Sequence, residues 1–374
     1  MSQKPLYKVT IFLTEDNRHT PFLVKALLDL EKKGFILLFF RTMPLLFSNR
    51  YVLTGNSFFR TKKGYPWCPE LIIIDLGTKK ECRIGIDLQD WSNFFSYHSI
   101  KKCDFVYKRA LTKNNFEILD KKIPNFFRPF GPNSYSKIND QRYHKNLKIS
   151  FYKQLFPKLI SNPFILINKA KNIFQISKNL KKDIIFTSNK ANNEPPRKAY
   201  VFFQVQYYNW ENKESKSLNF FRAQLIRLLK RKFKTRFYGG MWFLNKVPIA
   251  YKDCITNVDT NINTYNSFVK NATILISTNG FGGSVPWKLV EFLKLGSCIV
   301  AERNKHLLRG PLTKNQVSFF DNQNECINIC EKLLQNKKLI DAKKNNSLKY
   351  YKKYLGPKSI LKDLLEESFA ETRA

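Results

Sequence analysis

The sequence predicts an α/β protein with two Rossmann-like domains that face a central cleft, an arrangement called GT-B-like. Apolar segments of strand length alternate with amphipathic segments of helix length along most of the chain. This alternation weakens over residues 134–196 and then restarts, which divides the chain into two halves. At 374 residues the chain is also long enough for two average domains.

The first half opens with a β–α–β unit. Tyr7–Leu13 alternates between apolar and polar residues as a strand does, and Thr20 is placed to cap a helix that Gly34 ends. A second strand follows at once, so a doubly wound sheet is expected. The remaining predictions for this half are strands over 71–75, 83–88 and 103–107, a short helix over 91–97, and a final turn-rich segment over 126–132.

Acidic residues and a histidine follow these strands. Asp16 lies in the loop after the first strand, and Asp87, Asp90 and His98 lie at or beyond the end of a later one. Ligand-facing residues of open α/β sheets occupy such positions. The alternative is that they are solvated loop residues, some of which favour a following helix start.

The second half repeats the pattern. Strands are expected over 198–206, 236–238, 272–276, 298–301 and 317–320, and helices over 217–232, 265–270, 324–334, 337–354 and 359–369. The sequence Asn192–Pro196 suits a linker. The predicted boundaries are therefore 1–133 for an N-terminal acceptor-side domain, 134–196 for a helical and linker region, 197–355 for a nucleotide-sugar domain, and 356–374 for a C-terminal helix.

The segment 271–302 is the most informative part of the chain. A short buried strand leads into a loop with Gly280, Gly282 and Gly283, and Ser284 is placed to cap the helix that follows. Glycines allow backbone N–H groups to approach a ligand, and the free N–H groups at a helix start attract anions such as phosphate. Lys288 adds positive charge one turn into the helix. The alternative is an ordinary tight turn in a parallel sheet.

The stretch from Gly283 to Val300 resembles the nucleotide-sugar segment of GT-B glycosyltransferases, and most of all the bacterial enzymes that build capsule, lipopolysaccharide or exopolysaccharide chains. The shared pattern is a Gly/Pro loop, a helix that carries a glutamate, a small-residue helix end and a buried strand. It covers roughly 60 residues together with the helix and strand upstream, counted from Thr264.

The resemblance implies a role for several residues. Glu291 matches the glutamate that accepts hydrogen bonds from the donor's ribose hydroxyls. The loop amides of Gly280, Gly282, Gly283 and Ser284, with Lys288, would face the diphosphate. The resemblance further implies an enzyme that needs no bound metal and no cofactor, because the nucleotide-sugar is itself a substrate.

One departure from the family pattern leaves the stereochemistry open. Many retaining members carry a second glutamate eight residues before the ribose glutamate, and that position is Gly283 here. An inverting enzyme needs a base from the first domain, for which Asp16, Asp87, Asp90 and His98 are the candidates.

Net charge limits the choice of partners. The chain carries a formal net charge of +36, spread along its length, with far more lysine than arginine. This charge can reflect attraction to an anionic partner or a drift in composition toward lysine. Nucleic-acid readers favour arginine, so drift together with attraction to anionic lipid is favoured over nucleic acid. We therefore expect a cytoplasmic protein that can attach to the inner membrane face and transfer sugar to a glycan or lipid-linked acceptor. A basic nucleic-acid-binding protein and a non-catalytic GT-B-like partner subunit are the alternatives.

Cysteine usage agrees with a reducing compartment. The seven cysteines are scattered, and only Cys326 and Cys330 are close, without a histidine pair beside them. No zinc site and no disulfide framework are expected.

Overall fold

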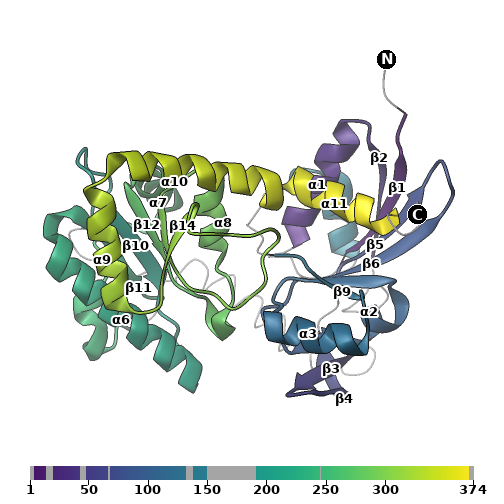
Figure 1. Ribbon diagram of the computed structural model, residues 1–374, viewed down its shortest axis with the longest axis horizontal. Coiled ribbons are helices and arrows are strands. Elements are labelled where there is room, and N and C mark those ends of the chain that lie inside the picture. Colours follow the sequence, from purple (N-terminus) through teal and green to yellow (C-terminus); the bar gives the residue numbers. More distant parts are fainter. Residues whose placement is uncertain are drawn as a thin grey trace. The chain divides into compact units, whose positions relative to one another are not determined.

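The computed structural model describes residues 4–13, 20–42, 48–65, 68–131, 138–149, 191–244 and 246–369. These residues form two compact units, each with its own sheet (Figure 1). Unit 1 contains the described residues up to 149, Lys305–Gly310 and the chain from Lys353 onward, and unit 2 contains the others. The predicted α/β class is confirmed, because helices cover a sheet with a parallel core in both units.

The main sheet of unit 1 has six strands in the order β2-β1-β5-β6-β8-β9. Their bounds are Tyr7–Leu13 (β1), Ile36–Thr42 (β2), Glu70–Asp75 (β5), Glu81–Asp87 (β6), Phe105–Lys108 (β8) and Phe127–Pro129 (β9). All neighbours pair in parallel except β5, which is antiparallel to both β1 and β6.

The antiparallel strand β5 corrects the expectation of a purely doubly wound sheet in this half. Only five residues separate β5 from β6, too few for the crossover that parallel strands need. The carboxylate of Asp75 accepts hydrogen bonds from the backbone N–H groups of Gly77 and Thr78, both at 2.9 Å, and thereby fixes a tight turn.

Helices cover one face of this sheet. Helix α1 (Thr20–Lys32), a helix over 141–149 and helix α11 (Pro357–Phe369) share one hydrophobic core with the strands. The C-terminal helix therefore belongs to unit 1, although a whole second unit precedes it in the sequence.

A small antiparallel sheet, β4-β3-β7, was not predicted. Its strands are Ser48–Thr54 (β3), Ser57–Tyr65 (β4) and Phe94–Ser96 (β7), and the short helices α2 (Tyr97–Lys102) and α3 (Lys113–Lys122) follow in the chain. The helix expected over 91–97 is wrong, because Phe95 pairs with Tyr51 of β3 and lies buried in a second core. The helix begins only after Ser96, whose hydroxyl accepts from the N–H of Ser99.

Unit 2 contains five parallel strands in the order β11-β10-β12-β13-β14. Their bounds are Val201–Gln206 (β10), Phe237–Trp242 (β11), Ile274–Ser277 (β12), Ile299–Glu302 (β13) and Val317–Phe320 (β14). Most of their residues are buried, as parallel strands covered on both faces require.

Two layers of helices enclose this sheet (Figure 1). Helices α6 (Lys213–Phe233) and α9 (Gln323–Leu334) pack on one face in a common core. Helices α7 (Ile262–Asn271) and α8 (Trp287–Lys294) lie on the other, where Phe268 of α7 stacks on Phe202 of β10. Helix α10 (Lys337–Tyr350) packs on α8 and α9 and leads into a π-helical turn over Tyr351–Leu355.

Strand β11 continues through Gly239 and Gly240, where the sequence predicts its end. Both glycines have positive φ angles, 118° and 134°. A Cβ atom at position 239 would lie 2.0 Å from the carbonyl oxygen of Phe203 on β10. The two glycines therefore permit close contact between neighbouring strands, and do not end the strand.

Candidate functional site

The glycine-rich loop after β12 lies at the topological switch point of the unit 2 sheet. The first strand of this unit, β10, has β11 on one side and β12 on the other, and the helices that follow β10 and β12 cover opposite faces. A crevice for ligands forms outside the carboxyl ends of two such strands. The two loops at this point are residues 207–212 after β10 and residues 278–286 after β12.

The loop over 278–286 contains a 3₁₀ turn, Phe281–Gly283. Gly282 and Gly283 both have a φ angle of 68°, which favours glycine. The predicted capping role of Ser284 is wrong, since α8 starts at Trp287 after Pro286 and has no side-chain cap. Ser284 instead follows the 3₁₀ turn, and its N–H bonds to the carbonyl of Phe281 at 3.2 Å.

The loop amides have specific partners. The N–H of Gly280 donates to the carbonyl of Ser284 at 2.8 Å, and the N–H of Gly283 donates to the carbonyl of Gly280 at 3.2 Å. The N–H of Gly282 donates to the carboxylate of Glu214, in the first turn of α6. Two of the glycine amides thus hold the turn itself, while the third already binds an anionic oxygen.

Arg222 on α6 joins the ends of the two strands. Its guanidinium donates to the hydroxyl of Thr278 at 3.2 Å, to the carbonyl of Asn279 at 3.0 Å and to the carbonyl of Gln206 at 3.2 Å. The side chain is buried, and this burial lowers the pKa of Arg222. It stays charged because arginine has a very high intrinsic pKa, so it adds a fixed positive charge beneath both loops.

Lys288, Glu291 and Tyr265 form a group on the opposite face of the sheet. The ammonium of Lys288 donates to the carbonyl of Gln204 on β10 and lies 5.1 Å from the ring centre of Tyr265. Burial and the nearby charge of Arg222 lower the pKa of Lys288 to about 8, although Glu291 opposes this shift. Burial raises the pKa of Glu291, and the positive charges of Lys288 and Lys294 oppose this increase.

The hydroxyl of Tyr265 is buried and has no hydrogen-bond partner among the described residues. Burial and the charge of Glu291 raise the pKa of Tyr265. Buried polar atoms without partners are rare in folded proteins and often mark the place of a ligand or water. Sequence reasoning did not select Tyr265, Arg222 or Glu214. Arg222 and Glu214 lie on α6, far from the glycine loop in sequence, and no local pattern distinguishes Tyr265 on α7.

The four candidate bases lie in the N-terminal half of the chain, far in sequence from Lys288, Glu291 and Tyr265. Asp16 falls outside the described residues. Asp87 is fully buried, with its carboxylate 3.0 Å from the ammonium of Lys108, and Asp90 pairs with Arg109. The Nε2 atom of His98 lies 3.0 Å from the carboxylate of Glu70, and its side chain is 22% exposed.

Exposure and ion pairing distinguish Asp87, Asp90 and His98 as possible bases. Asp87 has no exposed surface, and Asp90 is held by a guanidinium. His98 combines a partly exposed ring with a buried carboxylate 3.0 Å from its Nε2 atom, although these two atoms make no hydrogen bond in this geometry. Its geometry therefore suits a base better than that of either aspartate.

Other features of the described residues concern metals, thiols and membranes. No group of three or more His, Cys, Asp or Glu side chains in the described ranges could hold a metal ion. All seven cysteines are free and buried. Among the described helices, none has both the length and the apolar character to span a bilayer.

No protein-family model and no curated protein matches the chain. Several solved structures match it at low identity. They include the C-terminal domain of a glycosyl transferase group 1 family protein (LpcC) from Francisella tularensis (10% identity, 44% of this chain, 92% of that chain, TM-score 0.29). A mutant of S. aureus TarM in complex with Fondaparinux, alpha-GlcNAc-glycerol and UDP also matches (11% identity, 82% of this chain, 65% of that chain, TM-score 0.40).

A protein from Listeria monocytogenes described as a UDP-N-acetylglucosamine 2-epimerase is a further match (9% identity, 72% of this chain, 60% of that chain, TM-score 0.34). The present chain thus spans less than two thirds of the length of two of these three proteins. All three TM-scores are 0.40 or below.

Proposed function

We propose that the protein is a glycosyltransferase that takes a sugar from a nucleotide-sugar donor. The observation that carries this proposal is the position of the glycine loop, Lys288 and Glu291 at the switch point of a parallel sheet. The same residues carry the sequence resemblance to GT-B enzymes. The proposed acceptor is a glycan or lipid-linked saccharide, and the net charge of +36 favours work at an anionic membrane surface.

In the proposed reaction, an acceptor hydroxyl oxygen forms a bond to the anomeric carbon of the donor sugar. The bond from that carbon to the phosphate oxygen breaks, and the nucleoside diphosphate leaves with the electron pair. Lys288 and the N–H group of Gly282 stabilise the charge that develops on this leaving group. Glu291 holds the ribose hydroxyls through its two carboxylate oxygens.

Glu214 occupies the Gly282 N–H that a phosphate oxygen would use. A carboxylate oxygen on this amide supports the view that the loop accepts anionic oxygens. Donor binding through this amide then requires the Glu214 side chain to move aside.

The acceptor's proton must leave during the transfer. Among the described candidates, we propose His98 as the group that takes it, because of its partial exposure and its pairing with Glu70. This assignment makes the enzyme inverting.

Thermal unfolding with added nucleotides tests donor binding. Of UDP, GDP and CMP, the nucleotide that the donor carries should stabilise the protein by about 2.7 kcal/mol once its concentration is about 100 times its Kd. No stabilisation by any of the three would contradict the proposal. Stabilisation without sugar transfer or donor hydrolysis would instead favour the non-catalytic partner subunit, and salt-dependent DNA affinity without nucleotide binding would favour the nucleic-acid alternative.

Nucleotide affinity should depend on pH through Lys288. Its pKa of about 8 means that the ammonium loses its proton between pH 7 and 9, and phosphate binding favours the protonated form. We expect the Kd for the nucleotide to rise about tenfold from pH 7 to pH 9, as measured by calorimetry.

The variant Lys288→Arg is the matched control, because arginine keeps its charge over this range. Its Kd should stay nearly constant from pH 7 to pH 9. A wild-type Kd that does not change over the same range would show that Lys288 does not contact the phosphates.

A further inference from the structure

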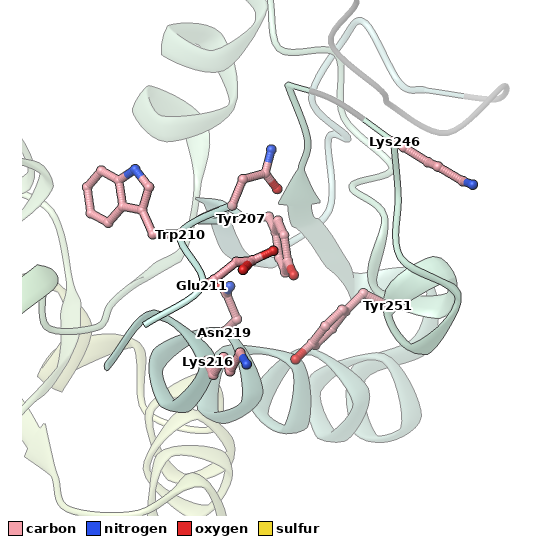
Figure 2. Close-up of a pocket in the computed structure, with 8 residues that line it drawn as sticks. Tyr207, Trp210, Glu211, Lys216, Asn219, Lys246 and Tyr251 are labelled. Atoms are coloured by element: carbon pink, nitrogen blue, oxygen red, sulfur yellow. The ribbon is translucent and has the colours of Figure 1, made fainter. Parts of the chain in front are cut away.

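A pocket of ≈ 570 Å³ lies in unit 2 beside the glycine-loop site (Figure 2). Its lining comes from the segment after β10, the first two turns of α6 and the segment after β11. This volume lies within the range of small-molecule sites. The pocket is on the β11 side of β10, whereas Lys288 and Glu291 are on the helix that follows β12.

Two aromatic rings form the wall of the pocket. The ring centres of Tyr207 and Tyr251 are 5.2 Å apart, and Figure 2 shows the two rings next to each other. Asn219 on α6 fixes the segment above them, since its side chain donates to the carbonyl of Tyr208 at 2.8 Å and accepts from the N–H of Tyr208 at 3.1 Å. The wall is therefore pre-formed.

Five polar side chains of this pocket are not engaged within the described part of the protein. The side chains of Asn209, Glu211 and Lys216, and the hydroxyls of Tyr207 and Tyr251, make no hydrogen bond or ion pair to any residue that the structure describes. Together they offer donors and acceptors, with one negative and one positive charge inside the pocket. Lys246 adds a second cation at the edge.

This combination narrows the class of ligand. The pocket carries charges of both signs, one carboxylate and two ammonium groups, on exposed side chains. An apolar ligand would cover these groups without offering them hydrogen bonds. A sugar ring carries hydroxyls that both donate and accept, and its C–H groups form an apolar face that packs on an aromatic ring. The pocket thus fits a saccharide.

Trp210 connects the pocket with the glycine-loop site. Its ring packs edge-on against Phe281 of the loop, with centres 4.9 Å apart, and stacks on Tyr208 at 5.2 Å. The Trp210 side chain is 53% exposed. A glycan bound in the pocket would therefore lie next to the loop that we assign to the donor diphosphate.

We propose that this pocket binds a saccharide unit of the acceptor glycan. The role as an acceptor site rests on the proposed glycosyltransferase function, whereas saccharide binding itself does not. Titration of the full chain with maltohexaose, chitohexaose and an oligogalacturonate, followed by calorimetry and tryptophan fluorescence, tests it. One of these probes should bind, and Glu211→Ala and Lys216→Ala should each weaken that binding at least about fivefold.

Controls separate this proposal from donor binding. Lys213→Ala removes an exposed lysine from the same helix outside the pocket and should leave the saccharide Kd unchanged. Glu291→Ala should also leave it unchanged, even where nucleotide binding is lost. The proposal is overturned if no probe binds at about 10 mM, if both pocket variants bind like wild type, or if the pocket variants lose nucleotide affinity instead.

Discussion

Replacing Glu291 by alanine should weaken nucleotide binding about 10- to 100-fold, because two hydrogen bonds to a charged acceptor are lost. The carboxylate of Glu291 lies on α8, the helix that follows the glycine loop. Its charge affects the pKa of Lys288 and the pKa of Tyr265, whose hydroxyl has no hydrogen-bond partner among the described residues. Calorimetry with the nucleotide that stabilises the wild type gives the two Kd values.

The free protein should remain folded in this variant. Burial raises the pKa of Glu291, which means that the folded environment disfavours its charged form. Removing the charge should thus leave the melting temperature without nucleotide unchanged or slightly higher. Binding and stability can then be read separately.

Two further variants sharpen this test. Glu291→Gln keeps one oxygen acceptor without the charge and should lose less affinity than Glu291→Ala. Asp341→Ala removes an exposed acidic residue from α10, in the same unit, and should bind like wild type. Equal Kd values for wild type and Glu291→Ala would remove the ribose role and, with it, the main support for the donor site.

The second unit was the more predictable part of the fold. Its strands are buried on both faces, so they appear in the sequence as short apolar runs such as Ile274–Ser277, and the helices between them show clear apolar faces. The position of the glycine loop after β12 followed directly from this alternation. Local pattern also located Lys288 and Glu291 on the following helix.

The first unit was less predictable because some of its structure depends on partners distant in sequence. Phe95 lies in a strand because it pairs with Tyr51 and packs in a core. No local sequence pattern indicates either of these contacts. The side chains that complete the candidate site have the same property. Glu214 and Arg222 reach the glycine loop from a helix about 60 residues earlier, and the ring centre of Tyr265 on α7 lies 5.1 Å from the ammonium of Lys288.

The ion pair between Asp87 and Lys108 should matter more for stability than any other described pair in unit 1. Both side chains are fully buried, with the carboxylate 3.0 Å from the ammonium, at adjacent strand ends of β6 and β8. The charge of Asp87 also contributes to raising the pKa of the buried Cys68 thiol, after the larger effect of burial. Breaking this pair would remove the opposite charge that compensates a buried carboxylate or ammonium.

Lys108→Met removes the ammonium but keeps most of the apolar volume around Phe95, so packing changes little. Because the ammonium is lost, this variant should destabilise the protein by about 3–5 kcal/mol. Urea unfolding measures this change. The double variant Asp87→Asn with Lys108→Met should recover much of the loss, since neither charge then remains buried. If Asp87→Asn instead left stability unchanged and abolished only sugar transfer, Asp87 would be the base in place of His98, and the buried pair would serve the reaction more than the fold.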